Sequence, residues 1–195
     1  MQKFNNQSFW ILFVVVALLS GIIGAGISGY VFSKMEQQTN NRIFNTYEDE
    51  MATFVSPVTV KGLIDKKDKN YILVDLRSNT EYKSGHIRTA VNIPAVTMNA
   101  AEIVAAFQRL PKDKEIIIHC YSSSCTLGRQ IGKLLAEHGI YVKEMDVGWN
   151  EWRYHWDLWN PGAKPEDGVK DYIVTGEGNA GVTLNLPCTV GVFGC

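Results

Sequence analysis

The stretch from Phe9 to Phe32 contains no charged residue and consists almost entirely of apolar and small side chains. At about 1.5 Å per residue, a helix of this length crosses a hydrocarbon core of about 30 Å. The stretch therefore predicts a transmembrane helix, which would tie everything after it to a membrane. A cleaved signal peptide is the alternative, although the apolar region of a signal usually runs for only about 7 to 15 residues.

The charges beside this helix specify its orientation weakly, because Lys3 and the N-terminal amine face Lys34 across it. We expect a single-pass protein of the cell membrane with its N-terminus inside and its domain extracytoplasmic. Small residues recur at every fourth position and form one helix face that favours a homodimer: Ala17, Gly21, Ala25 and Gly29. The plainer explanation is that glycine is common in membrane helices.

With 195 residues, the chain has room for one domain of ordinary size besides this anchor and a tail. Its 19 basic and 20 acidic residues nearly cancel, so the composition gives no reason to expect nucleic acid as a partner. Apolar residues spaced by three and four after the anchor predict an amphipathic stalk helix, packed on its own domain or on a partner stalk. The expected order is a flank at 1–8, a transmembrane helix at 9–32, a stalk at 33–55, a domain at 56–159 and a tail at 160–195.

Strand and helix patterns alternate through the domain. Ser56 and Pro57 suit an N-cap and a first helical position, and they predict a short helix that ends at about Asp65. Apolar runs predict strands at 71–75, 90–93, 115–119 and 141–145, and helical periodicity predicts helices at 99–109 and 127–138. This alternation is typical of an α/β fold with a mainly parallel sheet covered on both faces, whose ligands bind beyond the carboxyl ends of the strands.

The segment from Val74 to Pro94 carries a dense motif in the order Asp-x-Arg, Glu-Tyr, Gly-His-Ile and Ala-x-Asn-Ile-Pro. This order and spacing closely resemble the signature of the rhodanese-like family. The resemblance covers about Ser56 to Trp156 and implies a doubly wound, mainly parallel five-stranded sheet flanked by helices. Within the motif we expect structural roles for Asp75, Arg77, Glu81 and His86, with Arg77 and Glu81 forming a charge pair that braces the turn. Thr89 stands where the family usually has glycine.

Cys120 ends the apolar run at 115–119 and is followed by a polar loop and a helix. This arrangement resembles the active-site element of the family, and the resemblance implies that Cys120 is the catalytic cysteine. Backbone amides of such a loop stabilise a thiolate or persulfide anion and can lower a thiol pKa. We expect the cradle for that anion to comprise Tyr121, Ser122, Ser123, Ser124 and Cys125. A buried structural cysteine is the alternative, since free cysteine is among the most buried residue types.

The loop departs from the common family pattern, because it is longer than usual and lacks the basic residue that many sulfurtransferases carry there. Thiosulfate specificity is therefore not implied. Arg129 is the nearest cation and the candidate electrostatic residue, although it lies on the helix after the loop. Cys125 has three open interpretations: it resolves a persulfide on Cys120 as a disulfide, it acts as a redox partner in its own right, or it only lines the loop. We expect no metal and no cofactor, because one cysteine pair is an incomplete zinc site.

The resemblance continues through Met145 to Trp152, where Val147 replaces the first glycine of a family turn. Tryptophans then recur at helical spacing, which predicts one aromatic face that packs in the core or, as the minority interpretation, contacts a membrane or a partner: Trp149, Trp152, Trp156 and Trp159. The tail lies outside the resemblance. Its Cys188 and Cys195 favour a small disulfide loop or, less so, a thiol-bearing arm.

Two functions follow from these residues. The first is a membrane-anchored sulfurtransferase in which Cys120 takes sulfur from a sulfane donor, carries it as a persulfide and passes it to a thiol acceptor. The second is a catalytically weak binding or redox-sensing module that uses the pair Cys120 and Cys125. A phosphatase of the cell-cycle rhodanese-like kind is set aside, because it needs an arginine where this chain has Thr126.

Overall fold

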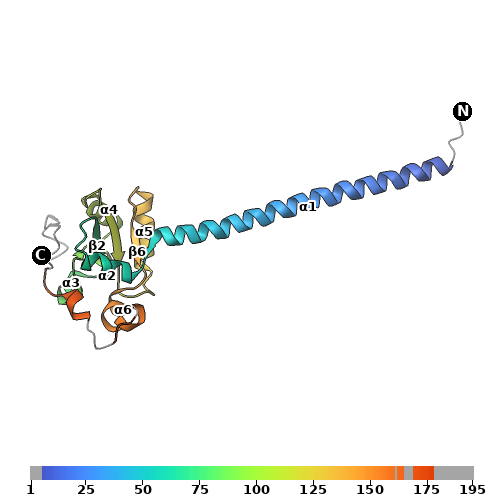
Figure 1. Cartoon of the computed structure of the whole chain (residues 1–195). Coiled ribbons are helices and arrows are strands. Elements are labelled where there is room, and N and C mark those ends of the chain that lie inside the picture. The colour runs from blue at the N-terminus through green and yellow to red at the C-terminus, as the bar shows by residue number, and fades with distance from the viewer. Residues whose placement is uncertain (1–5, 161, 165–168, 178–195) are drawn as a thin grey trace. The chain divides into compact units, whose positions relative to one another are not determined.

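The computed structural model describes residues 6–160, 162–164 and 169–177 (Figure 1). By its contacts the chain divides into two compact units, Met1–Glu50 and Met51–Cys195, and each is described by itself. The described part of the first unit lies in helix α1 (Asn6–Thr53), which continues through the expected anchor and stalk without a break. The prediction that the stalk packs on its own domain or on a partner stalk therefore stays a prediction.

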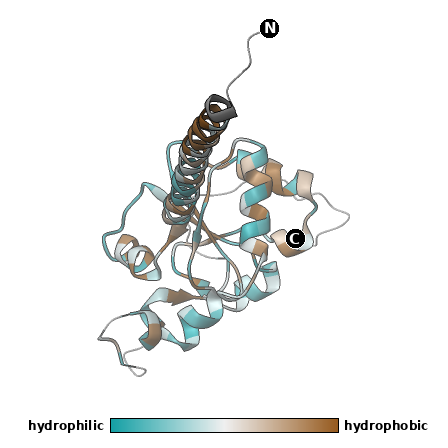
Figure 2. Cartoon of the chain, turned by 90° about the vertical axis from the view of Figure 1, so that its right-hand side faces the viewer, coloured by the Kyte–Doolittle hydropathy of each residue, from teal (hydrophilic) through white to brown (hydrophobic). Residues whose placement is uncertain are grey.

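Helix α1 has the length and composition to cross a membrane, a test that a signal sequence near the N-terminus also passes. Its candidate span is Trp10–Thr53, where the most apolar window has a mean hydropathy of 2.5. Figure 2 shows that the apolar residues gather along the part of α1 nearer the N-terminus. The boundary between an apolar anchor and a polar stalk stays a prediction from the sequence.

The second unit is built on a five-stranded sheet in the order β1-β6-β5-β2-β4, with every adjacent pair parallel. The five strands are β1 (Phe54–Val55), β2 (Tyr71–Asp75), β4 (Val91–Asn92), β5 (Glu115–His119) and β6 (Lys143–Met145). The predicted parallel α/β sheet is thus confirmed. The expected stalk at 33–55 extends too far, because its last two residues, Phe54 and Val55, belong to the sheet. They pair with Glu144 and Met145 and form the sheet edge. Two residues are too short a run to show strand periodicity.

Helices cover both faces of this sheet. They are α2 (Pro57–Asp65), α3 (Asn79–Ser84), α4 (Ala100–Gln108), α5 (Leu127–Glu137), α6 (Trp149–Tyr154) and α7 (Trp156–Trp159), with 3-10 turns η1 (Ala95–Thr97) and η3 (Val169–Tyr172). Ser56 caps α2 as predicted, since its Oγ accepts from the Val58 amide at 3.3 Å. Asn99 and Glu102 form a capping box that begins α4. Local capping residues thus define where these two helices begin.

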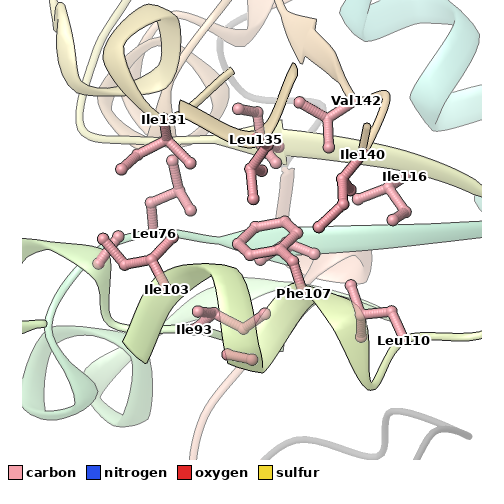
Figure 3. Packing of buried hydrophobic residues seen from close by; sticks show 14 of the residues in the cluster. Leu76, Ile93, Ile103, Phe107, Leu110, Ile116, Ile131, Leu135, Ile140 and Val142 are labelled. Carbon is pink, nitrogen blue, oxygen red and sulfur yellow. The ribbon is translucent and has the colours of Figure 1, made fainter. Parts of the chain in front are cut away.

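The core has two layers, one on each side of the sheet. Side chains of α4 and α5 pack on one face, where Phe107 and Leu135 are completely buried among aliphatic residues of the strands (Figure 3). On the other face, Val60 of α2 and Trp152 of α6 pack against Leu73 and Ile117. Strands β2 and β5 contribute to both layers and are buried along nearly all of their length. This accounts for their continuous apolar runs.

A second, two-stranded sheet joins β3 (His86–Ile87) to β7 (Ile173–Val174) in antiparallel register. The tail predicted from residue 160 onwards is therefore in part a piece of the domain. Tyr172 anchors the segment that leads into β7. Its hydroxyl donates to Asp65 at 2.6 Å, and its backbone oxygen accepts from the Arg88 amide at 2.8 Å. Cys188 and Cys195 lie outside the described residues, and their disulfide stays a prediction.

The tryptophan face is interrupted, since α6 ends at Tyr154 and α7 begins at Trp156. The rings nevertheless pack together: Trp152 stacks on Trp159 at 4.6 Å between centroids, and Trp156 lies 5.3 Å from the Tyr172 ring. Trp149, Trp152 and Trp156 are buried. These three rings thus fit the core interpretation of the tryptophan face.

Candidate active site

Cys120 lies directly after β5, the central strand of the sheet, and only 3% of its surface is exposed. The chain then turns back, with the Cys125 amide donating to the Ser122 oxygen at 3.0 Å. This turn brings the Sγ atoms of Cys120 and Cys125 to 2.7 Å of each other. We call residues 120–125 the cysteine loop. Two thiols at this distance are placed for exchange chemistry.

The ionisation of Cys120 differs from the expectation. Burial, followed by the hydrogen bond with Cys125, raises the pKa of the Cys120 thiol above its ordinary value, while the Tyr121 amide acts in the opposite direction but more weakly. The expected lowering of the pKa by a ring of loop amides is therefore wrong for this conformation. The physical reason is that the sulfur is buried and faces a second sulfur. In this arrangement the protonated thiol is the favoured form.

The cysteine loop rests on the start of α6. The amides of Trp149 and Asn150 donate to the oxygens of Cys120 and Tyr121, both at 2.9 Å. Gly148 allows this close approach, because a Cβ there would lie 2.2 Å from the Ser122 amide nitrogen. The close packing of two backbone segments thus requires glycine at position 148.

The serines of the loop were expected to donate to an anion. Ser123 does so, and the anion is the carboxylate of Glu151 on α6: the Ser123 amide lies 3.3 Å from each carboxylate oxygen, and its hydroxyl lies 3.2 Å from Oε1. Ser122 contributes its backbone oxygen to the turn, and Ser124 is exposed. Sequence reasoning missed Glu151. Its place as the third residue after Gly148, at the N3 position of α6, was the available signal.

Tyr121 connects the loop to α3. Its hydroxyl donates to Glu81 Oε2 at 2.6 Å, and Glu81 also accepts from Ser78 at the start of that helix. Burial opposes ionisation of Glu81, but the hydrogen bonds from Ser78 and Tyr121 outweigh it and hold the pKa of this carboxyl below its ordinary value. For Tyr121, burial and then the Glu81 bond raise the pKa to about 12. Glu81 therefore remains an anionic acceptor beneath the loop.

Arg77 pairs with Asp75 and not with Glu81, which corrects the expected charge pair. Its Nη2 lies 2.6 Å from Asp75 Oδ2, its Nε lies 3.0 Å from Oδ1, and both side chains are almost fully buried. Arg77 also donates to the Gly85 oxygen at 2.8 Å and lies 4.4 Å from the Trp149 ring. The bidentate geometry within one turn favours this partner, because Asp75 ends β2 and Arg77 follows it by two positions. The pair links β2, α3 and α6.

Two histidines complete this buried layer. His86 stacks on Tyr82 with ring centroids 3.7 Å apart, and its Nδ1 lies 2.8 Å from the Tyr82 oxygen. His119, which sequence reasoning did not select, lies beside Asp75 in the sheet register, with 3.7 Å between its Nε2 and Asp75 Oδ2. Burial lowers the pKa of both imidazoles below the ordinary value. Both imidazoles, which interact electrostatically with Asp75 and Arg77, therefore favour the neutral form.

Other motif residues fasten the same layer. The Asn92 side chain donates to the oxygens of Asp75 and Arg77 at 3.0 and 2.8 Å, and the Tyr82 hydroxyl donates to the Ala90 oxygen at 2.6 Å. Thr89 adopts a φ of 75°, the left-handed conformation that explains a glycine at this place in the family pattern. The motif is therefore a scaffold below the cysteine loop.

Arg129 does not supply the missing loop cation in this arrangement. Its guanidinium lies 5.8 Å from the Phe54 ring on β1, and its charge acts on Glu144 of β6. Burial raises the pKa of Glu144, which packs over Gly128 at the start of α5. Among the described residues no cluster of three or more His, Cys, Asp or Glu side chains could hold a metal ion.

These features define a parallel α/β domain whose central strand ends in a loop cysteine and whose neighbouring strand ends in a buried ion pair. The chain belongs to the rhodanese-like domain family, since the model of that family matches residues 56–155, just over half of the chain.

Several known proteins are similar to this chain at low sequence identity. Residues of the chain are 29% identical over 106 positions to a thiosulfate:glutathione sulfurtransferase of Saccharomyces cerevisiae, which covers 49% of this chain and 74% of that protein. They are 35% identical over 97 positions to the HTH-type transcriptional regulator Rv0324 of Mycobacterium tuberculosis and 32% identical over 73 positions to a tRNA uridine(34) hydroxylase of Buchnera aphidicola. The chain spans only 41% and 23% of those two relatives.

A solved structure supports the fold. The BH2092 protein of Bacillus halodurans superposes with a TM-score of 0.51 at 28% identity, over 60% of this chain and 82% of that one. The relatives thus differ in function and include a sulfurtransferase and a tRNA hydroxylase. The activity of this chain must be argued from its own site.

Proposed function

We propose that this protein is a membrane-anchored sulfurtransferase that carries sulfane sulfur as a persulfide on Cys120. The observation that carries the proposal is the position of Cys120 at the end of the central strand, inside a loop held by α6 and by Glu81. The similarity to the thiosulfate:glutathione sulfurtransferase of Saccharomyces cerevisiae supports it. The substrates are a sulfane sulfur donor and a thiol acceptor.

The reaction divides into two balanced steps. The Cys120 thiol loses its proton, and its sulfur attacks the sulfane sulfur of the donor, so that the donor leaves as an anion and Cys120 becomes a persulfide. An acceptor thiolate then attacks the outer sulfur of the persulfide and leaves Cys120 as a thiolate. Because burial and Cys125 favour the protonated thiol, separation of the two sulfur atoms would precede the first step.

The test is the intact mass of the full-length protein, in detergent, after incubation with a sulfane donor and removal of the excess. The expected result is a gain of one sulfur atom that reductant removes and that peptide mapping assigns to Cys120. Cys120→Ser should gain none, and Cys125→Ser should still gain one. Persulfide formation that persists in Cys120→Ser would contradict the site assignment.

A second function is favoured by the distance of 2.7 Å between the two sulfur atoms. In a redox-sensing or binding module, Cys120 and Cys125 would lose two protons and two electrons to a disulfide-bearing oxidant, which is itself reduced to two thiols. In the same mass experiment this function predicts a loss of two hydrogen atoms that links the two cysteines, with no sulfur gained. The two outcomes separate the candidates.

The membrane location is part of the proposal and rests on the apolar composition of residues 9–32. We place the domain on the extracytoplasmic side, with the small-residue face of α1 available to a second copy. Protease added to intact cells should then remove the domain and leave a short membrane-bound fragment that contains the anchor. Protection of the domain until the cells are lysed would reverse the orientation, and a fully soluble mature protein would identify a cleaved signal.

A further inference from the structure

A carboxylate is bound to the middle of the cysteine loop. Glu151 extends from α6 and accepts from the amide and the hydroxyl of Ser123, and its Oε2 also accepts from the Gly148 amide at 3.0 Å. One side chain thus ties the loop to the helix that supports it. The Ser123 amide is one of the donors expected to face the anion of a substrate, and here its partner is the protein's own anion.

Among the described residues, no basic side chain hydrogen-bonds to the cysteine loop or to Glu151, and Arg153 on the same helix lies over the Trp149 and Tyr154 rings. Residues 120–126 include no charged side chain. Tyr121 is bound to a second carboxylate, Glu81. Arg77 is buried against Asp75, and the described contact of Arg129 is with the Phe54 ring. Within the described part of the chain, the charged groups that hydrogen-bond to side chains of the cysteine loop are therefore both anions.

This arrangement has a consequence for the sulfur donor. Thiosulfate is a dianion, and two unit charges about 4 Å apart interact by about 1 kcal/mol even in water and by more near a protein surface. A dianion that approaches the loop meets that repulsion and also finds the Ser123 amide occupied. A persulfide carried by a small neutral or cationic thiol is repelled less than thiosulfate. It also depends less on the Ser123 amide as a donor.

We infer that Glu151 is a specificity-determining residue that disfavours dianionic donors, so that Cys120 takes its sulfur from the persulfide of an organic thiol in preference to thiosulfate. The inference rests on the proposed sulfur transfer and names its donor class. In the favoured step, the Cys120 thiolate attacks the outer sulfur of the donor persulfide, the bond between the two donor sulfur atoms breaks, and the organic thiolate leaves. With thiosulfate the leaving group would be sulfite.

The test uses the full-length protein in detergent and one acceptor, 2-mercaptoethanol, and follows formation of the acceptor's persulfide after subtraction of the rate without protein. The first donor is thiosulfate, and the second is cysteamine persulfide, formed from the trisulfide of cysteamine and one equivalent of cysteamine. Glu151→Gln removes the charge but keeps an oxygen that accepts from Ser123. We expect this variant to raise kcat/KM for thiosulfate about tenfold and to change that for the persulfide by less than about twofold.

Salt gives an independent readout that a purely structural role would not move. Raising the ionic strength from about 0.01 to about 1 M shortens the Debye length from about 30 to about 3 Å. The preference of the unsubstituted protein for persulfide over thiosulfate should shrink across this range, whereas that of Glu151→Gln should change little. Glu137→Gln is the matched control, because it removes one carboxylate from the exposed end of α5, and it should keep the original preference.

The outcomes distinguish a failure of the role inferred for Glu151 from a failure of the proposed sulfur transfer. If neither donor is turned over by the unsubstituted protein, the proposed sulfur transfer fails. If both donors are turned over but Glu151→Gln changes them equally, or changes neither, only the role of Glu151 is overturned. If Glu151→Gln does not fold, the salt dependence of the unsubstituted protein still decides, and a donor preference independent of salt would overturn the inference.

Discussion

The Tyr121 hydroxyl donates a 2.6 Å hydrogen bond to the Glu81 carboxylate across 40 positions of sequence, and this bond fastens the cysteine loop to α3. Tyr121→Phe removes only the hydroxyl. We expect it to lower the free energy of unfolding by about 1 kcal/mol, because a hydrogen bond to a charged group is lost at a partly exposed position. The measurement is the midpoint of urea unfolding. Tyr154→Phe, at an exposed position, should lie within about 0.5 kcal/mol of the original protein, and equal midpoints for both variants would contradict the role of the bond.

Gly148 brings α6 against the cysteine loop, and a Cβ there would lie 2.2 Å from the Ser122 nitrogen and 2.5 Å from the Tyr121 carbonyl carbon. Both neighbours are backbone, so Gly148→Ala must move the loop. We expect it to destabilise the domain by about 1–3 kcal/mol and to speed the alkylation of Cys120 by a thiol reagent. Gly132→Ala is the matched control within α5, where the new Cβ meets only Val142 at an ordinary 3.8 Å. That control should be neutral or stabilising, and slow alkylation in Gly148→Ala would argue against loop displacement.

The buried pair of Asp75 and Arg77 should respond very differently from an exposed pair. Arg77→Met leaves the Asp75 carboxylate without its partner, and we expect the free energy of unfolding to fall by about 3–5 kcal/mol, a large fraction of the stability of an ordinary domain. Lys61→Met breaks the surface pair with Asp65 and should cost at most about 1 kcal/mol. Thermal unfolding measures both. The double variant Asp75→Asn with Arg77→Met should be more stable than Arg77→Met alone, and a less stable double variant would count against charge burial as the cause.

His119 should make the domain sensitive to mild acid. Burial lowers the pKa of His119 in the folded protein below the ordinary value of 6.5. Its contribution to stability is therefore complete above pH 6.5 and is lost as the pH falls from there toward the folded pKa, because only the unfolded chain takes up the proton in that window. The slope is at most about 1.4 kcal/mol per pH unit for one such group.

Urea unfolding at several pH values between 7 and 5 measures this slope. His119→Gln should flatten it, whereas His138→Gln, which alters an exposed histidine, should leave it unchanged. If His119→Gln does not fold at pH 7, NMR of the unsubstituted protein decides instead. An imidazole of His119 that gains its proton near pH 6.5 would contradict the expected effect of burial.

Local sequence was sufficient for much of this protein. The strands at 71–75 and 115–119 and the helices that begin at Pro57 and Ala100 were predictable, because apolar runs and capping residues act within a few positions of each other. The motif from Asp75 to Pro94 and the place of Cys120 at a strand end were likewise readable. Parallel strands bring such ends to one edge of the sheet, so the sequence located the candidate site.

Only the tertiary structure decided which groups meet there. Strand β7 forms because β3 presents a pairing edge, Arg77 binds Asp75 and leaves Glu81 to Tyr121, and Glu151 reaches Ser123 from 28 positions away. The pairings of β3 with β7, of Glu81 with Tyr121 and of Glu151 with Ser123 have no periodicity or fixed spacing, since each depends on how helices and strands pack. The sequence by itself determined the elements and the cysteine, and packing determined the partners, the burial that raises the pKa of Cys120 and the charge beside its loop.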